Sequence, residues 1–343
     1  MAISRYILRR LLTMALTLLA ISALIFFIIK LPPGDYLTNQ IAELAAEGDT
    51  SSLAKAEFLR HQFGLDLPVW QQYLAWVGLM PGPNGWSGLL QGNWGWSFEY
   101  NQPVNTIVGQ ALVLTLIVNL AAVVFVHVVA IPIAIYSAVR QYSIGDYFVT
   151  FIGYIGLATP SFLLALVLLF YLNRWFGISI GGLMDPAYAD QPWSMPKMRS
   201  IASHLVVPTI VIGLASTAAM IRRMRANLLD ELQKQYVVTA RAKGLTEGRL
   251  LLKYPFRMSL NPFFADIGNI LPHLVSGSVL VSLVLNLPTV GPILLQALRV
   301  QDQYLAGFIL MFVAVLTVVG MLISDLALAA LDPRIRHAER AVR

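Results

Sequence analysis

Long apolar runs alternate with polar segments along almost the whole chain. The first run covers residues 11–29, and five more follow at about residues 111–135, 147–172, 205–221, 263–285 and 305–329. Each run approaches or exceeds the roughly 17–25 residues that an α-helix needs to cross a bilayer. The pattern therefore predicts an all-α integral membrane protein with six transmembrane helices. Pro132, Pro160 and Pro272 interrupt three of the runs, which a membrane bundle tolerates when neighbouring groups satisfy the freed carbonyls.

The first run could instead belong to a cleaved signal peptide, because Arg5, Arg9 and Arg10 precede it. The apolar core of a signal peptide is usually only about 7–15 residues long and ends at a cleavage site with small residues. Here the run is longer and is followed by Lys30-Leu-Pro-Pro-Gly-Asp35. We interpret residues 1–30 as an N-terminal tail and a retained first transmembrane helix.

Residues 31–105 form a polar segment with few basic residues. Ser51 to Gln62 has the pattern of a helix, Gly64 can end it, and Pro68 can open the next helix. Five of the seven Trp residues lie in this segment, at Trp70, Trp76, Trp86, Trp94 and Trp96. They could form a docking surface for a partner, although an aromatic belt at the membrane interface explains most of these rings better.

Composition agrees with a membrane protein. Hydrophobic residues make up 57% of the chain and charged residues 12%, with a mean hydropathy of +0.68. The charged share is about half that of a typical soluble domain. The chain has no Cys, which excludes a disulfide framework, a thiol nucleophile and a thiolate metal site.

Basic residues are concentrated in one set of loops. If the N-terminus lies inside, 17 of the 24 Lys and Arg residues fall in the N-terminal tail, at Arg140, in residues 222–257 and in the C-terminal tail. The positive-inside rule then predicts that both termini are cytoplasmic and that residues 31–105 are extracytoplasmic. This bias explains the net charge of +6 without nucleic acid.

Motifs for covalent or metal chemistry are mostly absent. No phosphate-binding G-x-x-x-x-G-K-[ST] pattern occurs, and the five His residues show no metal-ligand spacing. Asp266, His273 and Asp325 lie within or at the ends of membrane segments, where an ionisable group is a functional candidate. Satisfied polar contacts between helices explain them equally well, and the sequence assigns none of them a role.

The longest polar segment in the second half of the chain covers residues 222–258. Apolar or small residues recur every four positions along it, at Leu228, Leu232, Tyr236 and Ala240. This spacing predicts one side of a helix, which Gly244 can end and after which Thr246 can cap a second helix. Ala240 and Gly244 are small enough to let another surface come close. An amphipathic loop lying on lipid headgroups is the alternative.

The stretch Tyr236-Val-Val-Thr-Ala-Arg-Ala-Lys-Gly244 resembles the ATPase-coupling loop, or EAA loop, of permeases in ABC importers of the dipeptide/oligopeptide/nickel type. Further matches follow in order along nearly the whole chain: Arg9-Arg-Leu-Leu12, Pro33-Gly-Asp35, Gly64-Leu-Asp-Leu-Pro68, Gly92-Asn-Trp-Gly-Trp-Ser97, Pro103-Val104, Leu287-Pro288 with Gly291, and Asp332-Pro-Arg-Ile-Arg336. One such fragment would be weak evidence, whereas this many in order is highly specific.

The resemblance implies a type I ABC importer permease fold, in which residues 222–258 carry a short coupling helix that seats in a groove of a separate cytoplasmic ATPase. The implied contact residues are Tyr236, Val237, Thr239, Ala240, Arg241, Ala242, Lys243 and Gly244. Ala240 and Gly244 match the second alanine and the glycine of the broader importer motif. The glutamate of that motif falls at Val238 and its first alanine at Thr239, a departure that the peptide-type subgroup shares.

The resemblance also implies the surroundings of the chain. Its partners would be a second permease, two ATPase subunits and an extracytoplasmic binding protein, in the lipid of a prokaryotic inner (plasma) membrane. Residues 106–343 would form a five-helix transport domain, and ATP and Mg²⁺ would be bound by the ATPases, with no cofactor on this chain. A secondary transporter would usually show inverted repeats, which are not evident, and a channel or receptor would need a filter or a sensor domain.

One departure from the family concerns the cargo. Peptide-type permeases usually carry a Glu in the fifth helix, where this chain reads Val281-Ser-Leu-Val-Leu285. If Ser282 faces the pathway, a fixed negative charge has been lost there. We expect an oligopeptide as cargo and keep a neutral oligosaccharide as the alternative. Ser282 and Asp325 are the pathway candidates.

Overall fold

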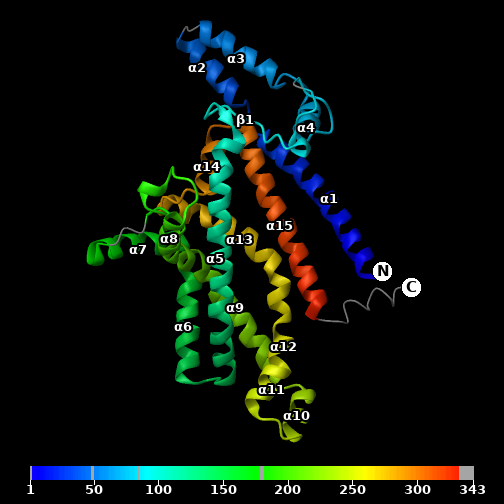
Figure 1. The fold of residues 1–343 in the computed structure, drawn as a ribbon, viewed down its shortest axis with the longest axis vertical. Coiled ribbons are helices and arrows are strands. Elements are labelled where there is room, and N and C mark those ends of the chain that lie inside the picture. Colours follow the sequence, from blue (N-terminus) through cyan, green and yellow to red (C-terminus); the bar gives the residue numbers. More distant parts are fainter. Residues whose placement is uncertain (1, 48–49, 84, 178–180, 332–343) are drawn as a thin grey trace. The chain divides into compact units, whose positions relative to one another are not determined.

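The computed structural model describes residues 2–47, 50–83, 85–177 and 181–331, and it divides the chain into two compact units. The first unit comprises Met1–Leu114 with Thr289–Val315, and the second comprises Thr115–Pro288 with Leu316–Arg343. Two long helices, α5 (Val104–Val139) and α15 (Gln303–Leu331), contribute to both units (Figure 1). Each unit is described by itself.

The first unit joins helices to a short two-stranded sheet. Its remaining elements are α1 (Ala2–Ile29), α2 (Tyr36–Glu47), α3 (Thr50–Gln62), α4 (Val69–Val77), η1 (Leu89–Gln91), β1 (Trp96–Ser97), β2 (Gln102–Pro103) and α14 (Val290–Arg299). The strands are antiparallel, with Trp96 opposite Pro103. The helix predicted over Ser51–Gln62 is confirmed as α3, and Gly64 follows it with a φ of +66°.

The Trp residues of this unit do not form one surface. Trp76 is buried against Phe26, and Trp94 stacks on Phe308 with ring centroids 4.2 Å apart. Trp70 and Trp86, in contrast, are exposed. The proposed docking surface is therefore reduced to single exposed rings, because part of the set packs into the interior of the unit.

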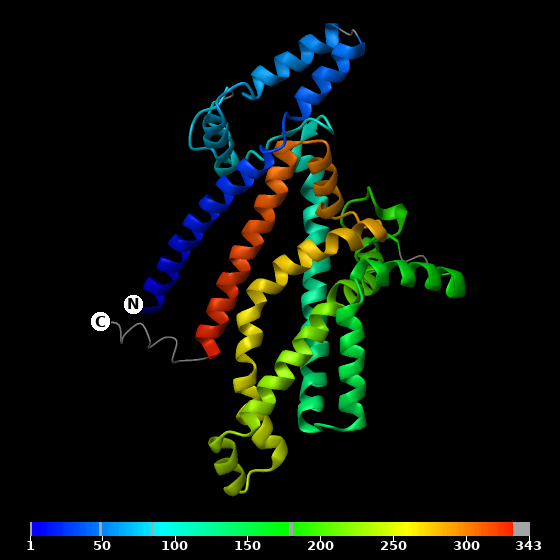
Figure 2. The same ribbon diagram turned by 180° about the vertical axis from the view of Figure 1, so that it is seen from behind.

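The second unit contains the loop of residues 222–258. Its remaining elements are α6 (Ile144–Ala158), α7 (Ser161–Phe176), η2 (Pro186–Tyr188), α8 (Met195–His204), α9 (Val206–Leu232), α10 (Gln235–Ala242), α11 (Glu247–Lys253), α12 (Pro255–Ser259) and α13 (Asn261–Val284). Figures 1 and 2 both show α9 running directly into the group α10–α12.

Four described helices are long and apolar enough to cross a membrane: Ile7–Ile29, Val104–Val139, Val206–Leu232 and Gln303–Leu328. They match four of the six predicted runs. A fifth span exists if α6 and α7 are counted as one broken span. The run 263–285 coincides with α13, but several of its side chains lie outside the described part of the chain. The count of six helices therefore stays a prediction.

The predicted run 147–172 is not one straight helix. The axes of α6 and α7 are bent by 100° at the break between Ala158 and Ser161. Thr159 is extended, with φ −85° and ψ 119°, as is usual for a residue that precedes proline, and Pro160 then caps α7. Pro132 has no such effect, since α5 continues through it. The sequence thus named Pro160 as one of three possible interruptions, but it predicted neither the bend at this proline nor its angle.

Small residues bring the helices of the second unit close together. Every fourth residue of α5 is buried, at Val118, Ala122, Val126, Ala130, Ala134 and Ala138. Gly213 of α9 lies against this helix, where an added Cβ would be only 2.8 Å from Cδ1 of Phe125. Close packing of this kind replaces the hydrophobic effect as a source of attraction between helices in lipid.

Candidate functional site

The loop that the sequence singled out begins where α9 ends. Gln233 keeps a helical backbone, but Lys234 is extended with ψ 147°, and α10 starts at Gln235. The predicted continuous stripe from Leu228 to Ala240 is therefore wrong. Leu228 is fully buried on α9, whereas Tyr236 is 38% exposed on a separate helix. The four-residue spacing continues across the break, so spacing alone could not reveal it.

Glu231 holds the two sides of this break together. Its carboxylate accepts a hydrogen bond from the Tyr236 hydroxyl and forms a 3.1 Å ion pair with Lys234 Nζ. The pKa of Tyr236 is raised, mainly by partial burial of the phenol and secondly by its hydrogen bond to Glu231. The phenol therefore stays protonated and can keep donating to Glu231. These contacts link the end of α9 to the start of α10.

A tight turn ends α10, as predicted. Gly244 has a φ of +80°, and its N–H donates to the carbonyl of Arg241 at 3.0 Å. The N–H of Leu245 donates to the carbonyl of Ala240 at 3.3 Å. This pair of bonds is the Schellman arrangement, in which glycine at the C′ position supplies the left-handed backbone. The expected role of Gly244 at the helix end is thus confirmed.

The start of α11 agrees with the prediction in position but differs in its contacts. Thr246 is the N-cap residue and is extended, yet its side chain makes no capping hydrogen bond. The carboxylate of Glu247, in the first turn, accepts two bonds from Arg241, at 2.6 Å from Nε and 3.1 Å from Nη2. These bonds lower the pKa of Glu247. Both side chains are exposed, so the ion pair orients the turn more than it stabilises the fold.

The loop has a small apolar core of its own. Val237, Ala240 and Leu250 are buried, and Leu245 and Tyr254 pack against them. Ala240 is only 6% exposed, so its small side chain allows α10 and α11 to approach each other. The sequence suggested that Ala240 and Gly244 share an outward surface. The structure instead places Ala240 inside the loop and leaves Gly244 exposed.

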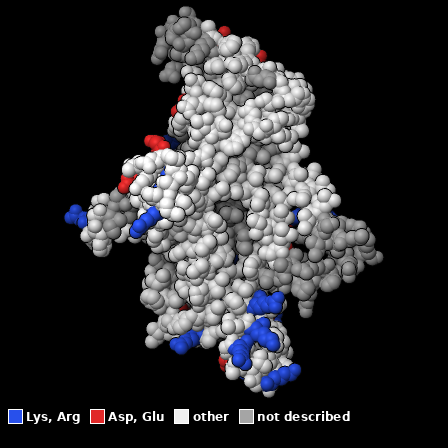
Figure 3. Space-filling view, in the orientation of Figure 1, with Lys and Arg blue, Asp and Glu red and all other residues white. Residues whose placement is uncertain are grey.

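The outward face of the loop is basic. The other predicted contact residues, Tyr236, Thr239, Arg241, Ala242 and Lys243, are exposed, as is Val238. Figure 3 shows Lys and Arg side chains gathered over α10–α12. The exposed basic residues of this segment are Lys234, Arg241, Lys243, Arg249, Lys253 and Arg257. A surface of this sign favours an acidic partner surface or anionic lipid headgroups.

The pathway candidates lie on two other helices of the second unit. Ser282 of α13 is buried, with 1% exposure, and Asp325 of α15 is partly exposed. The side chains of Asp266 and His273 fall outside the described residues. Within the described part of the chain, no group of three or more His, Asp or Glu residues could hold a metal ion. The role of Ser282 and Asp325 in a pathway stays a prediction.

The comparisons with known proteins agree with the features of the chain. Residues 130–337 match the family described as "Binding-protein-dependent transport system inner membrane component". Residues 3–121 match the family of N-terminal segments of such membrane components. The chain therefore belongs to the binding-protein-dependent inner membrane components. It is a multi-pass permease subunit of an ABC transporter and not an enzyme, as the resemblance indicated.

Three relatives show how far the similarity extends. The chain is 32% identical over 333 residues to the oligopeptide transport system permease protein AppB of Bacillus subtilis. It is 30% identical over 333 residues to the dipeptide transport system permease protein DppB of Lactococcus lactis, and 28% identical over 350 residues to the DppB of Escherichia coli K12. Each comparison covers 97% of this chain and 99% of the relative.

Proposed function

We propose that this permease passes oligopeptides into the cytoplasm and that α10 is its coupling helix. The observation that carries the proposal is the loop at the end of α9. Its helix is held by Glu231 on one side and by the turn at Gly244 on the other, and it presents an exposed basic face. An element that is fixed at both ends and polar outside is suited to transmit movement from a partner that binds it.

The peptide cargo is supported by the relatives, whose names assign them oligopeptides or dipeptides. The oligosaccharide alternative rested on the absence of a charge at Ser282. Because Ser282 is buried against its own chain, that absence is weak support for any choice of cargo. Peptide is therefore the better proposal.

The proposed partners are supported by the family to which the chain belongs, whose transport systems depend on a binding protein. In the proposed assembly this chain pairs with a second permease, two cytoplasmic ATPases and an extracytoplasmic binding protein. The ATPases bind ATP and Mg²⁺, and no cofactor is assigned to this chain. Closure of the ATPases draws the coupling helices together, and the permeases open outward to receive the cargo. Both termini and α10–α12 are cytoplasmic in this proposal. The Lys and Arg side chains within residues 222–257 support this orientation.

Reconstitution of the purified complex in vesicles tests the function. We expect uptake of a labelled peptide that requires ATP on the side of the ATPases and binding protein on the other side. Titration calorimetry of the associated binding protein tests the cargo separately, with short peptides, nickel and an oligosaccharide as ligands. Tight binding of nickel or of the oligosaccharide alone would contradict the proposed cargo, and uptake without ATP would contradict the proposed class.

A further inference from the structure

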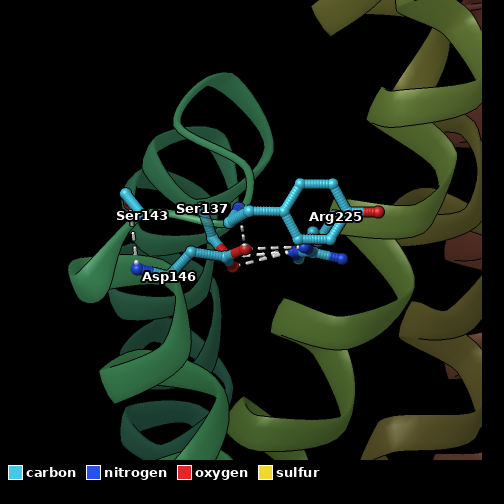
Figure 4. A network of polar contacts seen from close by, with 5 residues as sticks. Ser137, Ser143, Asp146 and Arg225 are labelled. Carbon is cyan, nitrogen blue, oxygen red and sulfur yellow. Dashed lines mark hydrogen bonds and ion pairs between the residues drawn. The ribbon is translucent and has the colours of Figure 1, made fainter.

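A polar cluster ties three helices of the second unit together, and the sequence analysis did not detect it. Asp146 lies in the first turn of α6, Ser137 near the end of α5, and Arg225 on α9 (Figure 4). Arg225 donates from Nε to Asp146 Oδ1 at 2.9 Å and from Nη2 to Oδ2 at 2.7 Å. The same Nε lies 3.0 Å from Ser137 Oγ, and the Ser137 hydroxyl donates to Asp146 Oδ1.

Asp146 is also the residue that organises the turn between α5 and α6. Its carboxylate accepts the N–H of Tyr142 at 2.9 Å, where the backbone has a φ of +64°. Its own N–H donates to Oγ of Ser143, the N-cap of α6, at 3.2 Å. An added Cβ at Gly145 would meet the Tyr136 hydroxyl, so α6 starts in close contact with α5. A displacement of Asp146 therefore displaces the whole turn.

The ion pair continues an antiparallel contact between α6 and α9. Gly156 faces Leu214, and an added Cβ there would lie 3.3 Å from Leu214 Cγ. About two turns further along α9, the guanidinium of Arg222 lies 5.7 Å from the ring centroid of Tyr154. Arg225 and Asp146 come next, two helical turns before α9 ends at Leu232. The pair is thus a polar contact at the end of the interface that leads into α10.

Burial and geometry distinguish this pair from an ordinary surface contact. Asp146 is 2% exposed and Ser137 fully buried, while the Arg225 side chain is 24% exposed. Two parallel bonds between a guanidinium and a carboxylate fix both distance and angle, which apolar packing does not. Taking such charges out of water is also costly, and apolar residues at a buried ion pair often stabilise a protein as well or better. Stability alone does not account for the pair.

We propose that Asp146 and Arg225 are positioning residues that make the α5–α6 hairpin move with the coupling loop. This proposal rests on the proposed function, since it requires that α10 is moved by an ATPase. The loop is joined to α9 at both of its ends: α10 follows directly after α9, and α12, at the other end of the loop, packs against α9. The bidentate pair then transmits a rotation or shift of α9 to the turn that begins α6.

The test uses the reconstituted complex with its ATPases and binding protein. Asp146→Asn keeps the size and the hydrogen bond to Tyr142 but removes the charge that holds Arg225. We expect this variant to retain the ATPases during purification, whereas the ratio of cargo-stimulated to basal ATP hydrolysis falls by about tenfold. Arg222→Gln is the matched control, because it removes a neighbouring cation from the same face of α9. Its ratio should stay within about twofold of wild type, as a single cation–π contact is weak.

A second variant keeps the test decisive if Asp146→Asn does not reach the membrane. Arg225→Lys preserves the positive charge but cannot make two parallel bonds. We expect normal abundance and a ratio reduced severalfold. Wild-type ratios in Asp146→Asn or in Arg225→Lys would overturn the proposal, as would a lowered melting temperature with an unchanged ratio. Failure of the wild-type chain to retain the ATPases would instead contradict the proposed function.

Discussion

Gly244 and Ala240 show how two small residues in one motif serve different purposes. At Gly244 the requirement is the backbone, because its φ is +80° and an added Cβ would meet nothing within 4 Å. At Ala240 the requirement is volume, because the side chain is enclosed by Val237 and Leu250. The sequence alone treats them as one surface. The structure separates a conformational role from a packing role.

This distinction leads to a prediction for Gly244→Glu. A left-handed conformation costs a residue with a Cβ about 1–2 kcal/mol, and the carboxylate would also add a negative charge to the basic face. We expect normal abundance in the membrane, weakened co-purification of the ATPases and lost cargo stimulation of ATP hydrolysis. Gly244→Asn is the control, because Asn tolerates the left-handed region without adding charge. Full stimulation in Gly244→Glu would show that the ATPase contact lies elsewhere.

Ala240 gives the complementary prediction. Ala240→Leu adds three carbon atoms to the small core between α10 and α11, and overpacking of this kind typically costs about 1–3 kcal/mol. We expect faster limited proteolysis within residues 233–254 and weaker ATPase retention, with the membrane helices intact. Thr239→Leu is the control, since Thr239 is exposed on the same helix. Equal protease sensitivity in the two variants would contradict the placement of Ala240 inside the loop.

The elements differ in how far the sequence could define them. The turn at Gly244 and the start of α11 are set by neighbouring residues, so their positions could be predicted. The break between α9 and α10 contains neither Gly nor Pro, and Glu231 bridges it by contacting Lys234 and Tyr236. A pattern of apolar positions does not register such contacts.

Contacts between residues far apart in the sequence could not be predicted, for a different reason. Asp146 and Arg225 are 79 positions apart, and each looks ordinary by itself: an acidic residue after a helix cap, and one of several arginines at the end of an apolar run. Their partnership follows from the antiparallel packing of α6 on α9. The bend of 100° between α6 and α7 was also not predictable from proline alone, since α5 continues through Pro132.

Close packing of α9 against α5 gives a prediction at the scale of elements. Gly213→Ala would place a Cβ 2.8 Å from Cδ1 of Phe125 and 3.5 Å from Cγ2 of Val126. Either the Phe125 ring or the two helices must then shift, and overpacking of this kind costs about 1–3 kcal/mol. We expect a lower melting temperature of the purified protein in detergent. Gly277→Ala in α13 is the control, because an added Cβ there meets nothing within 4 Å. A melting temperature unchanged by Gly213→Ala would contradict a tight contact between Gly213 and Phe125.

At the scale of the whole molecule, the distribution of charge carries the argument about orientation. Neither the family nor the apolar helices determine which side of the membrane each loop occupies. The basic residues predict an orientation, because loops rich in Lys and Arg near the ends of helices tend to be retained in the cytoplasm. Residues 222–257 hold nine of them, whereas residues 31–105 hold only Lys55 and Arg60.

The last prediction tests this orientation directly. The chain has no Cys, so a single cysteine can be introduced without background reaction. Glu57 of α3 and Gln233, between α9 and α10, are both exposed in the structure, so their reactivity should depend on the side of the membrane and not on burial. An impermeant thiol reagent applied to intact cells with a permeable outer barrier should label Glu57→Cys and leave Gln233→Cys unlabelled. Both should react once the membrane is disrupted, which controls for accessibility. The reverse pattern would place α10 outside the cell, where no ATPase could reach it, and the assignment of the coupling helix would be wrong.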